Sequence, residues 1–259
     1  MSNIGKLILK SPVGMIPGQD RNAEKYNRLS SKGASFVEIG PVSLAGQNIP
    51  KQKKKLFSRQ PAVTYDVSNK GIKTIIENIQ KRRPKTVLLA DITYNQGRSM
   101  VDDVVNDITK AFSLLYDFVD GFVIDTFRLN EEGSPMLQEV DFLSEVIDSL
   151  ANTRACYEEE KPIYVRIAPN IQEKVLIPML DYLRLAGVEG LIIGYNKTSL
   201  KTTRRVIALT KGRFPVIACG HTSSVEEALE YFNAGVMLLQ TDKRIKKINK
   251  AIQEGDIQK

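Results

Sequence analysis

The feature that most constrains the fold is an alternation of short aliphatic runs with longer stretches whose apolar residues recur at helical spacing. Eight of the short runs are expected to be strands, and they begin at Pro12, Ser35, Thr86, Gly121, Pro162, Gly190, Phe214 and Gly235. Eight helical patterns lie between and after them, beginning near Asp20, Gly71, Ser99, Pro135, Ile171, Ser199, Ser223 and Asp242. The strand runs are apolar nearly throughout, which is typical of parallel strands covered on both faces.

Local signals support these boundaries. Ser99 precedes the pattern MVDDVVNDI and Ser223 or Ser224 precedes VEEALEYF, so that these serines are expected N-caps with carboxylates in the following turn. Glycines follow three of the helical stretches, at Gly33, Gly187 and Gly235. A glycine there can adopt the left-handed conformation that ends a helix.

Eight such units predict a closed (β/α)₈ TIM barrel, and the length of 259 residues fits one barrel domain over residues 1–259. The alternative is an open doubly wound sheet. That fold would be favoured by a GxGxxG turn after an early strand, and the sequence contains none. In a barrel, functional residues lie at the carboxyl ends of the strands and in the loops that follow them.

Composition excludes several classes of protein. No apolar run approaches the roughly 20 residues of a transmembrane helix. The first residues, MSNIGKLILKSPVG, lack the features of a signal peptide, so a cytoplasmic location is expected. Cys156 and Cys219 form no CxxC motif, and His221 is the single histidine. A disulfide framework and a metal site are therefore not expected.

The 37 basic and 30 acidic side chains give a net charge of +7, and much of the excess lies in two clusters. One cluster spans Lys51–Lys55, and the other spans Lys243–Lys250. Basic clusters attract nucleic acid or anionic lipid. Neither cluster is interleaved with aromatic residues for base stacking, so we expect no nucleic acid and no membrane as partner.

Four ordered blocks span most of the sequence. They are SPVGMIPGQDRNAE, GASFVEIGPVS, VRIAP with GVEGLII, and TKGRFPVIACGHTSSVEEALEYFNAGVMLLQ. Together they resemble the dihydroorotate dehydrogenase family, and its membrane-associated class more than its cytosolic class. The resemblance implies a barrel that uses FMN to oxidise dihydroorotate to orotate in pyrimidine biosynthesis, commonly as a homodimer. Members of that class usually carry an N-terminal helical extension. We expect this extension to be lacking, because the first expected strand begins at Pro12.

The resemblance also implies site residues. Gly18 stands where the family has a glycine against the flavin, Asp91 where it has an asparagine, and Arg166 where a lysine holds the flavin ring. Gly220 and His221 replace the paired glycines that bind the flavin phosphate. For the substrate the implied residues are Arg21, in place of a lysine, Asn130, and the sixth-strand asparagine at Tyr195 or, with a shift of one residue, Asn196.

The catalytic candidates by resemblance are Asp125, Arg128 and Asn130, where the family has asparagine, the serine base and asparagine. Arginine cannot accept a proton near neutral pH. Asp91 or Asp125 could replace the base, but neighbouring guanidinium groups would weaken either carboxylate as a base. Loss of a positioned base lowers a rate by on the order of 10²- to 10⁴-fold.

The phosphate site is also altered in the sequence, because Asp242 stands in the turn that completes it in the family. A carboxylate there would repel the phosphate. We therefore expect FMN binding and dihydroorotate oxidation to be weak or lost. The alternative function is a non-catalytic barrel that binds another small anionic ligand or a partner protein.

The charged residues at the barrel mouth leave two interpretations open. Arg21, Arg128 and Arg166, together with Asp91 and Asp125, could bind an anionic ligand or could form an ion-pair network that fills the space of a flavin. Buried charges must be paired, which favours the network. His221 could act as an acid or base near neutral pH, although a lone histidine is more often a surface or packing residue.

Overall fold

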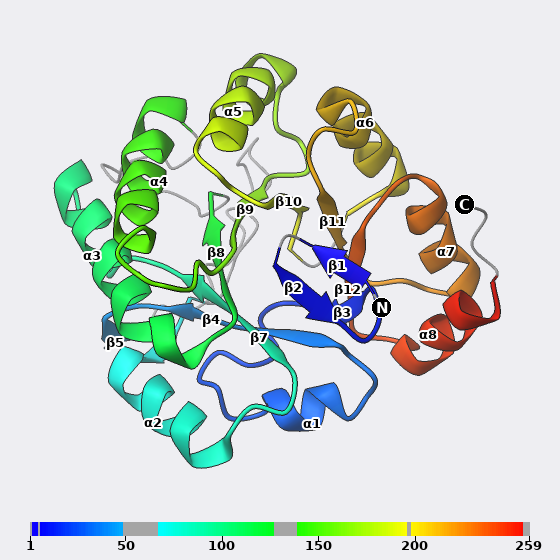
Figure 1. Ribbon diagram of the computed structural model, residues 1–259, viewed down its shortest axis with the longest axis horizontal. Coiled ribbons are helices and arrows are strands. Elements are labelled where there is room, and N and C mark those ends of the chain that lie inside the picture. Colours follow the sequence, from blue (N-terminus) through cyan, green and yellow to red (C-terminus); the bar gives the residue numbers. More distant parts are fainter. Residues whose placement is uncertain (1, 5, 49–66, 127–138, 196–197, 256–259) are drawn as a thin grey trace, which may run out of the picture.

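Eight strands form one parallel sheet in the order β3-β12-β11-β10-β9-β8-β7-β4. The structure is a computed structural model, and it describes residues 2–4, 6–48, 67–126, 139–195 and 198–255. The sheet curls into a barrel with helices around it (Figure 1). The barrel strands are β3 (Val13–Met15), β4 (Phe36–Val42), β7 (Val87–Ile92), β8 (Gly121–Asp125), β9 (Ile163–Ile167), β10 (Gly190–Ile193), β11 (Val216–Cys219) and β12 (Leu238–Thr241). The predicted (β/α)₈ fold is confirmed, and each of the eight predicted strands is present.

The barrel closes between its first and second strands without a regular ladder. The amide of Ser35 donates to the carbonyl of Val13 at 3.0 Å, and an isolated parallel bridge joins Asp20 to Ile39. Gly14 permits this approach, because a Cβ atom at Gly14 would lie 2.3 Å from the ring of Phe36. The Phe36 ring thus fills the place where β3 would otherwise carry a side chain.

The surrounding helices bury their apolar faces against the sheet. Helix α3, for example, buries Val104, Ile108 and Phe112, as expected for an amphipathic helix. None of the helices in the described ranges has the length and apolar character needed to cross a bilayer. The helices are α1 (Tyr26–Ser30), α2 (Ile72–Arg82), α3 (Val101–Leu115), α4 (Val140–Arg154), α5 (Glu173–Leu185), α6 (Leu200–Thr210), α7 (Val225–Asn233) and α8 (Ile245–Glu254), with a 3-10 turn η1 (Tyr116–Phe118).

One of the expected N-caps is confirmed and one is wrong. Ser224 caps α7, and its hydroxyl accepts a hydrogen bond from the amide of Glu227 at 3.1 Å. Ser99 does not cap α3, because the residue at that position is Met100, which makes no side-chain capping bond. Positive φ values confirm the expected helix ends, at Gly33, Gly187 and Gly235.

The first helix begins at Tyr26 rather than near Asp20. The carboxylate of Asp20 accepts hydrogen bonds from the amides of Glu24 and Lys25 at 2.8 and 2.7 Å, so it stabilises a loop. Ala23 within that loop has a φ of 54°, which a right-handed helix cannot contain. The predicted start of the fourth helix, near Pro135, lies outside the described residues.

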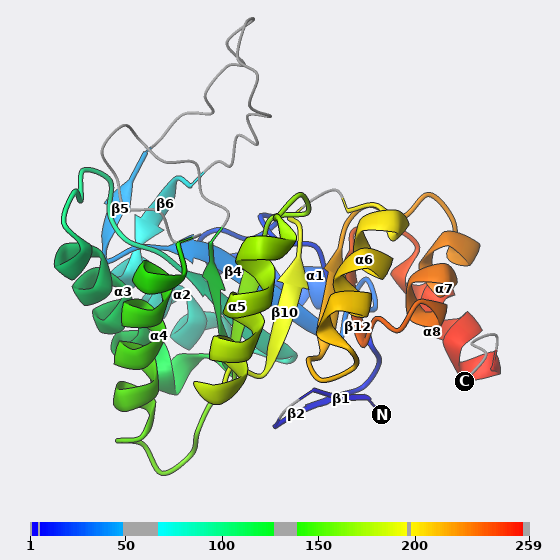
Figure 2. The same ribbon diagram turned by 90° about the horizontal axis from the view of Figure 1, so that it is seen from above.

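Two short antiparallel hairpins, which the sequence did not predict, lie at opposite ends of the barrel (Figure 2). Strands β1 (Ser2–Ile4) and β2 (Leu7–Leu9) form the first hairpin at the end where the barrel strands begin. Leu9 is buried there. Strands β5 (Ala45–Gln47) and β6 (Asn69–Gly71) pair at the other end, which is the expected functional end.

An ion pair outside the barrel links α4 to the start of two strands. Arg154 Nη1 lies 3.0 Å from Glu189 Oε1, and Arg154 Nη2 donates to the carbonyl of Gly187 at 3.1 Å. The other carboxylate oxygen of Glu189 accepts the amide of Ile163 at 2.7 Å. Burial raises the pKa of Glu189, while the Ile163 amide and Arg154 oppose that rise.

Arg154→Ala is expected to lower the free energy of unfolding by about 3 kcal/mol near neutral pH, because Glu189 is left without its cation. The folded-state pKa of Glu189 then rises further above its unfolded value. A carboxyl group with a raised folded-state pKa favours the fold most at low pH. The variant's deficit in free energy of unfolding relative to wild type therefore grows as pH rises through that folded-state pKa. Thermal unfolding at about pH 4.5 and about pH 8 measures this difference. The exposed Arg204→Ala serves as control, and a deficit that does not change with pH would contradict the expectation.

Candidate functional site

Three predicted site residues meet at the carboxyl ends of adjacent strands. Asp91 lies on β7, Asp125 ends β8, and Arg166 lies on β9 in register with Asp125. All three are buried, and Arg166 has no exposed surface. The rule that barrel strands converge at this end therefore placed these residues correctly in one cluster.

Arg166 is the centre of this cluster. Its Nη2 atom lies 2.5 and 2.6 Å from the two carboxylate oxygens of Glu38, and its Nη1 atom donates to the carbonyl of Gly194 at 2.8 Å. Its Nε atom lies 3.5 Å from Asp125 Oδ2. Burial alone would lower the pKa of Arg166, but Glu38 and Asp125 outweigh it and hold the pKa well above its ordinary value. The guanidinium therefore stays charged inside the barrel.

Glu38 is the main site residue that the sequence analysis missed. It lies in the middle of β4, and Gln240 on β12 donates to it through Nε2 at 2.8 Å. The available signal was a carboxylate inside the apolar run FVEIG. A charge buried in such a strand requires a partner of opposite charge. Arg166 on β9, far from Glu38 in the sequence, is that partner.

Tyr195 contacts both Gly18 and Arg166. A Cβ atom at Gly18, whose φ is +77°, would lie 2.5 Å from the Tyr195 hydroxyl oxygen. The Arg166 guanidinium carbon lies 5.4 Å from the centre of the Tyr195 ring, which is a cation–π distance. Burial raises the pKa of Tyr195, so the phenol stays neutral. The phenol ring thus occupies the space in front of Gly18.

The loops after β11 and β12 bring together the residues expected at a flavin phosphate. The amide of Gly220 donates to the carbonyl of Gln240 at 3.0 Å. His221 Nδ1 lies 2.7 Å from Asp242 Oδ1, with the histidine side chain half exposed. Asp242 therefore faces an imidazole at this place, and the Gly220 amide already has an acceptor.

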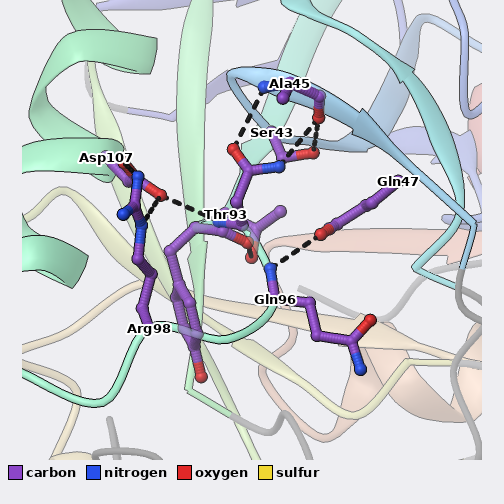
Figure 3. A network of polar contacts seen from close by, with 9 residues as sticks. Ser43, Ala45, Gln47, Thr93, Gln96, Arg98 and Asp107 are labelled. Atoms are coloured by element: carbon purple, nitrogen blue, oxygen red, sulfur yellow. Dashed lines mark hydrogen bonds and ion pairs between the residues drawn. The ribbon is translucent and has the colours of Figure 1, made fainter.

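A polar network fixes the loop after β7 against the β5–β6 hairpin (Figure 3). The Asn95 side chain exchanges hydrogen bonds with the backbone of Ala45 at 3.0 and 2.9 Å. The backbone amide of Asn95 donates to the Asp107 carboxylate at 3.0 Å. Arg98 binds the same carboxylate in a bidentate manner, with both distances 3.0 Å. Asp107 is buried, so this network holds one wall of the barrel mouth in a fixed position.

Of the remaining predicted site residues, the structure describes Arg21 and leaves three others outside the described ranges. Arg21 is half buried after β3, next to Asp20. Arg128, Asn130 and Asn196 lie outside the described residues. Within the described ranges, no group of three or more histidine, cysteine or acidic side chains is arranged to hold a metal ion.

Comparisons with known proteins identify the relatives of this chain. The sequence model of the family described as "Dihydroorotate dehydrogenase" matches residues 1–198. A dihydroorotate dehydrogenase (quinone) of Christiangramia forsetii is 27% identical over 262 residues, covering 90% of this chain and 76% of the relative. That of Trichodesmium erythraeum is 26% identical, covering 92% and 72%.

The solved structures agree with the barrel fold. A crystal structure of DHODH from Eimeria tenella in complex with ferulenol superposes with a TM-score of 0.80 at 20% sequence identity. The superposition covers 98% of this chain and 85% of that one. The family match extends over most of the chain, and the chain therefore belongs to the dihydroorotate dehydrogenase family.

Proposed function

We propose that this member has kept the barrel of the family, while FMN-dependent oxidation of dihydroorotate is weak or lost. The observation that carries the proposal is the position of Tyr195, whose hydroxyl lies against Gly18 and whose ring lies over Arg166. Members of the family use FMN, and family membership by itself favours dihydroorotate oxidation. The side chains described here do not fit that cofactor.

The ring end of a flavin would need the space in front of Gly18 and a free cation on β9. Tyr195 takes the space, and Glu38 and Gly194 take hydrogen bonds of Arg166. To admit a flavin, the Tyr195 ring would have to leave the guanidinium, and Arg166 would have to give up part of its bonding to Glu38. Each rearrangement would expose a buried charge to a poorer partner.

The phosphate end is also unsuited to FMN. A phosphate needs converging backbone amides, and the Gly220 amide already binds the carbonyl of Gln240. Asp242 adds a carboxylate to this place, held by His221. A carboxylate beside a phosphate is repulsive, and the repulsion is strong where water is excluded.

The base for the reaction is likewise missing from the expected place. The sequence has Arg128 where the family resemblance implies the serine base, and a guanidinium has no acceptor for a proton. Asp125, three residues earlier in the chain, is a carboxylate, but its Oδ2 atom lies 3.5 Å from Arg166 Nε. Its lone pairs are thus directed in part to an ion pair rather than to a substrate.

Binding of a small anionic ligand at the mouth is the second candidate function. Arg21 follows β3, and Lys243 and Arg244 follow β12, so that cations stand after two neighbouring strands. The net charge of +7 favours the approach of an anion. Four expectations from the sequence stay predictions. They are a homodimer, a partner protein in place of the small ligand, a single domain over the whole chain and a cytoplasmic location.

An activity assay tests the proposal. Dihydroorotate is supplied with excess FMN and a quinone acceptor, and orotate formation is followed beside the Christiangramia forsetii relative under the same conditions. We expect a rate lower by at least about 10²-fold, the lower bound for loss of a positioned base. A rate within about tenfold of the relative would contradict the proposal. Circular dichroism of the assayed sample shows that the protein is folded.

A further inference from the structure

A groove lies between α5 and α6, remote from the mouth. Its cavity volume is about 170 Å³, and it is formed by α5 from Ile177 onward, the end of α6 and the segment after α6. Leu180, Leu209 and Phe214 provide apolar lining. Helices α5 and α6 run back toward the end of the barrel where the strands begin (Figure 2). The residues that line the groove therefore lie away from the mouth.

The rim of the groove is basic. Arg184, Lys211 and Arg213 line it and are all exposed, and Asp181 is the acidic residue beside them. Within the described part of the chain, none of the three cations makes an ion pair with a carboxylate. Three cations beside the single carboxylate of Asp181 leave the lining with a net positive charge, which attracts an anionic group.

Exposed aliphatic side chains extend the groove along α5. Ile177 is 47% exposed and Leu185 is 78% exposed. Their spacing of eight residues places them on one stripe of the helix with Asp181. Burial of such side chains is favourable by about 25 cal/mol per Å² of apolar surface, so a partner that covers this stripe gains free energy.

We propose that the α5–α6 groove binds an acidic peptide segment of a partner protein, which inserts one apolar side chain between Leu180 and Phe214. The volume favours this class of ligand, because pockets that bind drug-sized molecules measure roughly 300–1,000 Å³. A cavity of 170 Å³ suits one large anchoring side chain. The carboxylates of the segment bind Arg184, Lys211 and Arg213. This inference does not depend on the proposed function of the mouth.

A second copy of this chain is a poorer occupant. A two-fold symmetric dimer places the same patch of both subunits face to face. The three cations of one groove would then oppose the same three cations of the other. Dimerisation through the groove is therefore an outcome that would overturn the proposal.

Two synthetic peptides serve as probes. The first has glutamates on both sides of Leu-Phe-Leu, and the second has lysines in place of the glutamates. We expect the acidic peptide to shift the backbone amide resonances of Arg184 and of residues 210–214, in spectra of the ¹⁵N-labelled full chain. Added salt weakens this binding because the rim charges are exposed. The lysine peptide is expected to cause no shift there.

Matched variants locate the site. Arg213→Glu reverses a rim charge and is expected to weaken binding of the acidic peptide by at least about tenfold. Lys174→Glu makes the same charge change at an exposed position of α5 that does not line the groove, and it should leave the affinity within about twofold. Equal weakening by both variants would overturn the proposal. So would equal binding of both peptides, no shift with the acidic peptide, shifts confined to the mouth, or a dimer that Arg213→Glu disrupts.

Discussion

Arg166→Met is expected to lower the free energy of unfolding by about 3 to 5 kcal/mol, because it leaves Glu38 and Asp125 buried without their cation. Arg166 is fully buried, and Glu38 and Asp125 are 2% and 3% exposed. For a protein of this size each kcal/mol corresponds to roughly 2 to 4 °C in Tm. Chemical denaturation and calorimetry of the variant beside wild type measure the effect.

A second substitution separates loss of the pair from loss of packing. In Arg166→Met combined with Glu38→Met, the carboxylate is removed together with its cation. We expect this double variant to regain at least about 1 kcal/mol relative to Arg166→Met alone. A loss below about 1 kcal/mol in Arg166→Met would mean that the ion pair does not form in solution.

Gly40→Ala is expected to cost about 3 kcal/mol or more. Gly40 has a φ of +114°, and a Cβ atom there would lie 2.5 Å from the carbonyl oxygen of Asp91 and 3.0 Å from the amide nitrogen of Val42. Backbone strain of this kind costs about 1 to 3 kcal/mol. The clash adds a similar amount, because the carbonyl belongs to the neighbouring strand and cannot move without displacing Asp91.

Gly97→Ala is the matched control for this prediction. Gly97 also has a positive φ, of +86°, but apart from its own chain neighbours no atom of the described residues lies within 4 Å of the position that its Cβ would take. It therefore suffers only the strain of the left-handed conformation, about 1 to 2 kcal/mol. Equal losses in urea denaturation of the two variants would show that β4 and β7 are not in close contact at Gly40.

The barrel could be predicted from the sequence because its signals are local. Each run such as TVLLADI and each helical pattern such as MVDDVVNDI is recognised within about ten residues. The exact helix starts depend on other interactions. Asp20 binds two loop amides rather than beginning a helix, and propensity alone did not reveal that α3 begins with Met100 as its N-cap.

The centre of the site could be predicted only in part. The rule for barrel strands placed Arg166, Asp91 and Asp125 together, since each lies near the carboxyl end of a strand. The partner Glu38 is 128 residues away from Arg166 in the chain. No local pattern reports such a contact, and the β5–β6 hairpin is likewise formed by segments far apart in sequence.

Tyr195 shows that a family resemblance does not determine the direction of a side chain. The resemblance placed the substrate asparagine of the family at Tyr195 or Asn196, which concerns position along the chain. The direction of the Tyr195 ring depends on Arg166, and the fit against Gly18 depends on the missing Cβ. Both are packing relations between residues that lie far apart in the sequence. They are the observations from which we propose that FMN binding is weak.

The visible absorption spectrum of the purified full chain shows whether this barrel holds FMN. The protein is incubated with FMN, desalted and measured beside the Christiangramia forsetii relative treated in the same way. We expect a colourless protein, because on the proposed function Tyr195 and Glu38 oppose binding of the flavin ring and Asp242 opposes binding of the phosphate. Flavin bands at one FMN per chain would contradict the proposed function.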